Sequence, residues 1–238
     1  MANRIITPSQ TPCSSIDTAI LAGGQSKRLG VEKTMLPFGE STLLEVVVEE
    51  IRSKIAPYAE IMIIKRPEVR IPEIKGKDKG KDKDKNKDKG KGVKFVNDAL
   101  EKDGALIGIL TALLYSKTDY CFIFACDMPF LNSSLISKML SIKRNYDALV
   151  PYSRRGIEPL HAIYSRRCLR KAYECIKHND LSVNSMLKQV KTEYIKADLY
   201  CNPDVAFMNI NTIEDYELAL YSNKRKEELC HLQELPAH

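Results

Sequence analysis

The stretch Thr18-Ala19-Ile20-Leu21-Ala22-Gly23-Gly24-Gln25-Ser26-Lys27-Arg28-Leu29-Gly30-Val31-Glu32-Lys33 decides the fold of this 238-residue chain. Its short apolar start predicts a buried strand. The glycines that follow let main-chain N–H groups approach a ligand, because they carry no Cβ. Consecutive N–H groups in such a loop form a concave anion site, and Lys27, Arg28 and Lys33 add positive charge. The stretch therefore predicts a strand followed by a loop that binds a nucleoside triphosphate.

Two well-known phosphate-binding patterns do not match this loop. A Walker A loop needs a glycine, four residues, and then Gly-Lys followed by Ser or Thr. Here five residues separate Gly24 from Gly30, and Val31 follows directly. The dinucleotide-binding pattern Gly-x-Gly-x-x-Gly also requires other intervals between its glycines. The loop therefore indicates a different class of nucleotide-binding protein.

Strand and helix patterns alternate along the rest of the chain, which favours a mostly parallel sheet flanked by helices. Further strands are expected at 60–64, 93–96, 120–125, 147–150, 157–164 and 207–210. Helices are expected after an N-cap at Ser41 as far as Ile55, at 105–115, 133–143, 166–177 and 182–190, and from Thr212. The predicted fold class is α/β, a three-layer α/β/α sandwich with a Rossmann-like, mostly parallel sheet.

One segment carries the whole net charge of +6. Residues 75–94 contain ten lysines and four aspartates, so the rest of the chain is formally neutral and no nucleic-acid partner is expected. Residues 75–92 have no apolar side chain to bury and are predicted to form a disordered surface insertion. The expected organisation is an N-terminal extension over 1–16, a single domain over 17–222 and a C-terminal tail over 223–238.

Cysteine and apolar patterns favour a cytoplasmic protein. The seven cysteines are odd in number and form no Cys-x-x-Cys pair, which argues against a disulfide framework and a zinc site. No apolar run approaches the roughly 20 residues of a membrane span, so no membrane contact is expected. The first 15 residues lack the basic segment and apolar core of a secretory signal.

Aspartates follow two of the predicted strands. Asp127 ends the most apolar strand, and ligands of open α/β sheets bind at the carboxyl ends of strands. A carboxylate there can hold Mg²⁺ that bridges phosphates, and the alternative role is a turn or helix cap. Asp98 follows another strand, in an Asn-Asp pair that is also typical of turns.

The pattern Leu-Ala-Gly-Gly-x-Ser-x-Arg-x-Gly-x-x-Lys over residues 21–33 resembles the signature loop of the MobA-like nucleotidyltransferases, which build guanylylated molybdenum cofactor. Close relatives attach CMP to molybdopterin, or nucleotides to sugars and cobalamin precursors. Four later segments also resemble this family: the metal-binding motif at 125–130, a Gly-Pro-Leu-x-Gly stretch at 104–108, Glu-Pro-Leu at 158–164 and Asn-x-Asn-Thr at 209–215. The resemblance covers residues 17–220 outside the insertion and implies the nucleotide-diphospho-sugar transferase type of fold.

The resemblance implies roles for individual residues. The expected catalytic residues are Arg28, Lys33 and Asp127, and Asp127 is also the expected ligand of the cofactor Mg²⁺. The expected nucleotide contacts are Leu21, Ala22, Gly23, Gly24, Lys33, Asp98 and Asp127, with Asp98 at either the base or the ribose. The expected contacts to the second substrate are Glu158, Asn209 and Asn211, the two asparagines lying at the end of a strand. His161 is not expected to be a general base, because a phosphate nucleophile is already anionic at neutral pH.

The implied reaction transfers GMP from GTP to the terminal phosphate of molybdenum-bound molybdopterin and releases pyrophosphate. GTP and molybdopterin are the expected partners, together with transient contacts to proteins that deliver molybdopterin or mature molybdoenzymes. The chain departs from the family where some members place an asparagine after the second strand, since it has Lys65-Arg66 there, so base specificity stays open. The alternatives are a CTP-dependent cytidylyltransferase, another small-phosphate nucleotidyltransferase, and a nucleotide-binding regulatory protein without catalysis.

Overall fold

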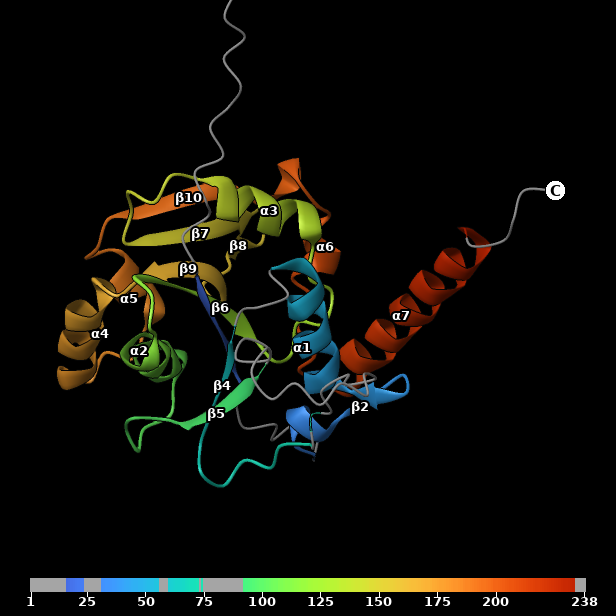
Figure 1. Cartoon of the computed structure of the whole chain (residues 1–238), viewed down its shortest axis with the longest axis horizontal. Helices are drawn as coiled ribbons and strands as arrows, with labels where there is room; N and C mark the ends of the chain where they lie inside the picture. Colours follow the sequence, from blue (N-terminus) through green and yellow to red (C-terminus); the bar gives the residue numbers. More distant parts are fainter. Residues whose placement is uncertain (1–15, 24–30, 56–59, 73, 75–91, 234–238) are drawn as a thin grey trace, which may run out of the picture.

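A computed structural model describes residues 16–23, 31–55, 60–72, 74 and 92–233, with side chains as far as residue 225 (Figure 1). Most of the expected N-terminal extension, nearly all of the expected insertion and residues 24–30 of the glycine loop lie outside this set. Within it, a mostly parallel sheet has helices on both faces. The predicted α/β/α architecture is confirmed.

The sheet follows the strand order β10-β7-β9-β6-β1-β4-β5, with β8 paired to β7. Strand β1 runs parallel to β4 and β6, β4 to β5, and β7 to β10, whereas β9 is antiparallel to β6 and β7. A separate hairpin pairs β2 with β3. The strands are β1 Asp17–Leu21, β2 Pro37–Phe38, β3 Ser41–Thr42, β4 Ile61–Lys65, β5 Val93–Asn97, β6 Tyr120–Ala125, β7 Ala148–Ser153, β8 Gly156–Ile157, β9 His161–Ser165 and β10 Thr192–Lys196.

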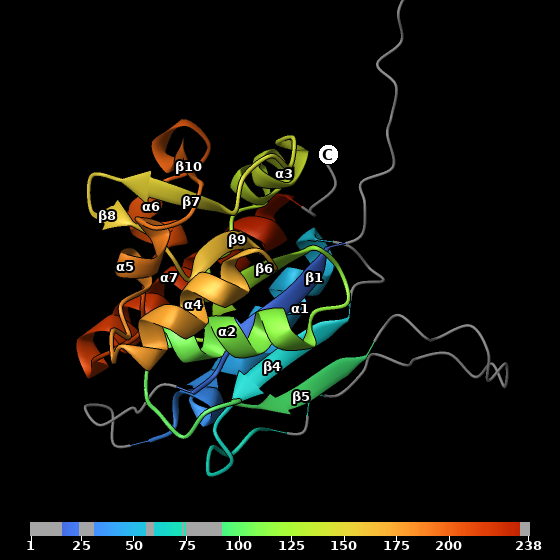
Figure 2. The same cartoon turned by 90° about the vertical axis from the view of Figure 1, so that its left-hand side faces the viewer.

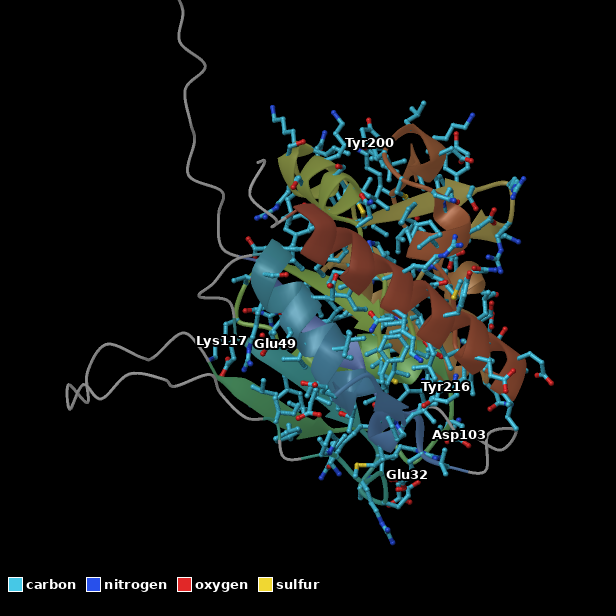
Figure 3. All side chains as sticks on the ribbon, turned by 90° about the vertical axis from the view of Figure 1, so that its right-hand side faces the viewer. Glu32, Glu49, Asp103, Lys117, Tyr200 and Tyr216 are labelled. Atoms are coloured by element: carbon cyan, nitrogen blue, oxygen red, sulfur yellow. The ribbon has the colours of Figure 1, made fainter. Side chains whose placement is uncertain are left out.

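Helices α2, α4 and α5 cover one face of the sheet, and α1 and α3 cover the other. Figure 2 looks onto α2 and α4, and Figure 3 looks from the opposite side onto α1 and α7. The helices are α1 Leu43–Lys54, α2 Ala105–Tyr115, α3 Ser133–Ser141, α4 Cys168–Lys177, α5 Val183–Leu187, α6 Pro203–Ala206 and α7 Ile213–Gln233, with short 3-10 turns at Lys33–Met35 and Ala197–Leu199.

Alternate residues of the strands fill the two cores, because successive side chains of a strand point to opposite faces. Ala19 and Met62 pack on the α2 side, whereas Ile20 and Ile63 pack on the α1 side. All six residues of β6 are buried, as expected for a central strand covered on both faces. This burial fixes the register and so fixes which residues end the strands at one edge of the sheet.

The start of α1 differs from its prediction. Its N-cap is Thr42, not Ser41, which lies in β3. The Thr42 hydroxyl accepts a hydrogen bond from the Glu45 N–H, and the Glu45 carboxylate accepts one from the Thr42 N–H at 2.8 Å. This reciprocal pair is a capping box, and the Ser41 position has no glutamate three residues later to complete one.

Two predicted strands in the second half were wrong. The segment predicted as one strand over 157–164 is split into β8 and β9 by a turn at 158–160. Residues 207–210 form no strand, and the missed strand β10 occupies the sheet edge instead. Phe207 and Ile210 are buried, but they pack into different clusters, Phe207 with the α1 side of the sheet and Ile210 with Phe38. These residues are apolar because the loop that carries them is buried against two separate clusters.

The predicted start of the last helix at Thr212 is confirmed by its cap. The Asp215 carboxylate accepts hydrogen bonds from the N–H groups of Asn211 at 3.0 Å and Thr212 at 2.9 Å. Helix α7 continues to Gln233, past the expected domain end at 222, and Figure 1 shows it extending away from the sheet. Across the described part of the chain, no helix has both the length and the apolar character that crossing a membrane requires.

Candidate functional site

The carboxyl ends of β1, β4, β5 and β6 lie along one edge of the sheet, because these strands are parallel neighbours. A cavity of about 430 Å³ lies at this edge. Its lining includes five residues that the sequence placed at a nucleotide: Leu21, Gly23, Lys33, Asp98 and Asp127. Other lining residues were not expected there, and the charged ones are Arg66, Lys102 and Asp103.

A cluster of one cation and two oxygen-bearing side chains lies at the cavity, and two of its members, Lys33 and Asp127, line it. The Lys33 ammonium donates hydrogen bonds to Asp127 Oδ2 at 2.6 Å and to Asn211 Oδ1 at 2.5 Å. The side chains of Lys33 and Asp127 are only 10% and 18% exposed. An ion pair with so little water around it is weakly screened, and its two hydrogen bonds hold the Lys33 ammonium at a fixed place.

The backbone fixes Asn211 beside this ion pair. The Ile210 N–H donates to the carbonyl oxygen of Asp127 at 3.0 Å, which ties the segment before α7 to the end of β6. The Asp215 cap holds the Asn211 N–H from the other side. Asn211 therefore reaches Lys33 from a loop, not from the end of a strand as the sequence had suggested.

Asp98 lies at the end of β5, against the glycine loop. Its N–H donates to the Lys65 carbonyl at 2.8 Å, and the Thr111 hydroxyl donates to its Oδ1 at 3.4 Å. Burial raises the pKa of Asp98, an effect that the Thr111 hydrogen bond and the Arg66 charge partly oppose. A Cβ on Gly23 would lie 3.3 Å from Asp98 Oδ2, so only glycine lets the loop pass this carboxylate without a shift.

Some main-chain groups at the start of the glycine loop form hydrogen bonds with neighbouring strands and their ends. The Leu21 carbonyl accepts a hydrogen bond from Cys126 at 3.2 Å, and the Ala22 N–H donates to Ile64 at 2.8 Å. Leu21 and Gly23 line the cavity, whereas Ala22 is buried beneath them. Gly24 and Arg28, two further expected site residues, lie outside the described residues.

The expected contacts to the second substrate are more dispersed. Asn211 is hydrogen-bonded to Lys33, but none of the three expected contacts, Glu158, Asn209 and Asn211, is among the described residues that line the cavity. Glu158 lies in the turn before β9, two positions before Leu160, which lines the cavity. Burial raises the pKa of Glu158 to about 7, with the charge of Arg155 opposing the rise.

The cluster offers oxygen atoms to a divalent cation. Asp127 and Asn211 already bind a cation, the Lys33 ammonium, and carboxylate and amide oxygens are ligands that Mg²⁺ accepts. Within the described ranges, no three or more His, Cys, Asp or Glu side chains are grouped to hold a metal. Mg²⁺ at nucleotide sites commonly takes one or two carboxylates and completes its shell with phosphates and water. The donor set fits that mode and does not form an all-protein cage.

His161 is buried behind the site and not in it. The edges of Phe122, Phe124 and Phe207 surround its ring at centroid distances of 5.7, 5.0 and 5.4 Å. Neither ring nitrogen has a hydrogen-bond partner among the described residues. Burial lowers the pKa of His161 to about 3, so the imidazole is neutral at physiological pH. The structure agrees with the inference that His161 is no general base.

His161 is expected to make the protein less stable in mild acid. Because its pKa falls from 6.5 to about 3 on folding, only the unfolded chain binds the proton between these values. The free energy of unfolding therefore decreases as pH falls below 6.5, by about 2 kcal/mol at pH 5 from this group alone. Denaturant unfolding of His161→Leu and the wild type at pH 7.5 and 5.0 measures this difference.

The comparison with the wild type is needed because Glu158 changes the free energy of unfolding in the opposite direction to His161 as pH falls. Its pKa rises from 4.5 to about 7 on folding, so its contribution to stability increases as pH falls through this window. Ile163, buried on the same strand as His161, provides a matched control, and Ile163→Val should keep the wild-type pH dependence because it changes no titratable group. Equal pH dependence in His161→Leu and the wild type would contradict the prediction.

Three charged residues of the cavity, Arg66, Lys102 and Asp103, were missed from the sequence. Arg66 follows β4 and forms an ion pair with Asp103, which precedes α2. The two are separated by 37 positions in the chain, so no local pattern joins them. The available signal was positional, because Arg66 follows the strand after which some related proteins carry a nucleotide-contacting asparagine.

Comparisons with known proteins identify the family and the fold of this chain. The profile of a family described as "MobA-like NTP transferase domain" matches residues 18–193. A protein of Natranaerobius thermophilus is 34% identical over 86% of this chain and 95% of its own length, and one of Methanosarcina mazei is 32% identical over 87% and 91%. Both are named probable molybdenum cofactor guanylyltransferases. The crystal structure of molybdopterin-guanine dinucleotide biosynthesis protein A from Archaeoglobus fulgidus has the same fold, with a TM-score of 0.69, 24% identity and coverage of 88% of this chain and 100% of that one.

Proposed function

The chain belongs to the family of MobA-like NTP transferases, and on that premise we propose that it transfers GMP from GTP to the terminal phosphate of molybdenum-bound molybdopterin. The products are the guanine dinucleotide form of the cofactor and pyrophosphate. The names of the curated relatives support the substrates. The observation that carries the proposal is the cluster of Lys33, Asp127 and Asn211 at the cavity.

The reaction needs positioned charge more than it needs a base. An oxygen of the acceptor phosphate attacks the α-phosphorus of GTP, and the bond from that phosphorus to the bridging oxygen of the β-phosphate breaks. The acceptor phosphate is already anionic, so no proton has to be removed at neutral pH. Positioning and electrostatic stabilisation dominate such transfers.

Each described residue of the cluster has a proposed task. Lys33, fixed by its two oxygen partners, stabilises the negative charge that develops on departing pyrophosphate. Asp127, with Asn211 beside it, would hold Mg²⁺, which when bound neutralises charge on the phosphates. Asp98 and Gly23 bind the nucleoside part, and Arg28 adds positive charge from the glycine loop. Glu158 and Asn209 are proposed to contact the acceptor.

Pyrophosphate release from GTP, CTP and ATP tests the proposal. The full chain, with Mg²⁺ and molybdenum-bound molybdopterin, should release pyrophosphate rapidly with GTP and at background rates with the other two nucleotides. Each nucleotide without acceptor is the control, and release should require the acceptor. Release with CTP alone would indicate a cytidylyltransferase, and no release with any nucleotide would favour a non-catalytic nucleotide-binding protein.

A further inference from the structure

The cavity has a second charged end, formed by Arg66 and Asp103. The Arg66 guanidinium forms an ion pair with Asp103 Oδ1, and its Nε lies 3.1 Å from Glu68 Oε1. The Arg66 side chain is 17% exposed and Asp103 is 67% exposed. Both residues line the cavity, whereas Glu68 does not, and Figure 3 shows Asp103 toward the same end of the molecule as Glu32. Because Glu68 and Asp103 both pair with Arg66, the arginine fixes the position of the Asp103 carboxylate, which faces the cavity.

The other two carboxylates of the cavity have places that suit other parts of a nucleotide. Asp127 pairs with Lys33 and belongs to the phosphates under the proposed function. Asp98 ends a strand beside Gly23, and a carboxylate in such a place binds ribose hydroxyls in related α/β folds. Among the described lining residues, this leaves Asp103 as the carboxylate available to the base.

A carboxylate is better matched to guanine than to cytosine. It accepts hydrogen bonds but donates none when ionised, and each carboxylate offers about four lone-pair sites. Guanine presents two neighbouring donors, N1–H and N2–H₂, whereas cytosine presents the acceptors N3 and O2 and a single donor group, N4–H₂. Cytosine can therefore give the carboxylate one hydrogen bond at most, whereas guanine gives it two.

We propose that Asp103 selects guanine by accepting hydrogen bonds from N1–H and N2–H₂, and that Arg66 is a positioning residue that holds its carboxylate. The ion pair occupies Asp103 Oδ1 and leaves lone pairs of the carboxylate for the base. This inference rests on the proposed function, because it assigns the base of the same nucleotide. It also supplies a source of guanine selectivity in a chain that has Lys65-Arg66 where some relatives have asparagine.

Equilibrium binding of four nucleotides to the full chain, without acceptor, tests the assignment. The probes are GTP, ITP without the 2-amino group, XTP with a 2-carbonyl group, and CTP. The wild type should bind GTP about 10-fold more tightly than ITP, the loss expected for one hydrogen bond to a charged group. Asp103→Asn should bind GTP more weakly and XTP more tightly than the wild type does, because the amide of asparagine can donate a hydrogen bond to the 2-carbonyl group. The GTP-to-XTP affinity ratio should fall by about 100-fold.

Matched variants separate base selection from structural damage. Asp147→Asn removes the same charge from an ion pair that lies outside the cavity and should keep the wild-type GTP-to-ITP ratio. Asp103→Ala should bind GTP and ITP with equal affinity. Arg66→Ala should reduce the ratio of GTP affinity to ITP affinity. Arg66→Lys should restore part of that ratio, because it retains the charge beside the carboxylate. These ratios would not change if the substitutions affected folding alone.

The two proposals can fail separately. Tighter binding of CTP than of GTP by the wild type would contradict the guanylyltransferase function. A wild type that prefers GTP, together with Asp103→Asn and Asp103→Ala variants that keep its profile across GTP, ITP and XTP, would overturn the role of Asp103 and leave the function standing.

Discussion

Asp127→Asn is expected to lower the rate of pyrophosphate release by about 10²- to 10³-fold, the effect typical of losing one preorganised charge at a reacting centre. The amide keeps the size of the side chain but removes the negative charge. Lys33 then loses its ion-pair partner at 2.6 Å, and the proposed Mg²⁺ site loses its carboxylate. Steady-state pyrophosphate release at saturating GTP and acceptor, repeated over a range of Mg²⁺ concentrations, measures the effect.

Asp147→Asn is a matched control for this substitution. Asp147 forms an ion pair with Arg167 at 2.6 Å before β7, and it does not line the cavity. Its substitution removes the same charge and an ion pair of the same length, so the rate should remain within a few-fold of the wild type. A rate near normal in Asp127→Asn, with the thermal midpoint unchanged, would exclude Asp127 from the reaction.

Lys33→Ala is expected to reduce kcat by at least about 10²-fold, because the leaving pyrophosphate then loses its fixed cation. The substitution also leaves Asp127 without its buried counter-charge and removes a donor from Asn211. Lys33→Arg should restore only part of the rate, because the larger guanidinium cannot occupy the same place between two oxygens. Single-turnover pyrophosphate release separates this effect on chemistry from any change in nucleotide affinity.

Lys117→Ala provides the corresponding control. Lys117 pairs with Glu60 at 2.8 Å and is 70% exposed, so the variant loses a lysine ion pair that lies outside the cavity. Its kcat should match that of the wild type. Normal turnover in Lys33→Ala would contradict the proposed role of the lysine and would favour a nucleotide site without leaving-group stabilisation.

The elements that the sequence predicted well are those with a strong pattern of their own. Helix α2 and strand β6 have the predicted bounds, because their residues are almost all apolar and both are buried in the core. Strand β10 was missed because only Ile195 of its five residues is buried at the sheet edge. The false strand at 207–210 arose because a buried loop and a strand have the same local apolar content. Tertiary packing, which the sequence pattern does not show, separates the two.

The site was predictable to the extent that strand ends determine it. The parallel pairing of β1, β5 and β6 with their neighbours brings the residues after these strands to one cavity. These residues are Lys33, Asp98 and Asp127, as their positions in the sequence predicted. Their chemical roles remain predictions. The contact of Asn211 with Lys33 depends on the loop before α7, and the pairing of Arg66 with Asp103 depends on two more loops. Loop conformation has no periodic signal, so these contacts emerge only from the structure.

The bond between Lys33 and Asn211 also sets when a newly made molecule can become active. The two residues are 178 positions apart, so a ribosome that adds about 5–20 residues per second makes the asparagine roughly 10 to 35 seconds after the lysine. During that interval the nascent chain contains Lys33 and, for the later part, Asp127, but not the segment that completes their cluster. A polypeptide that has the glycine loop early therefore acquires its full set of cluster residues only once position 211 has been made.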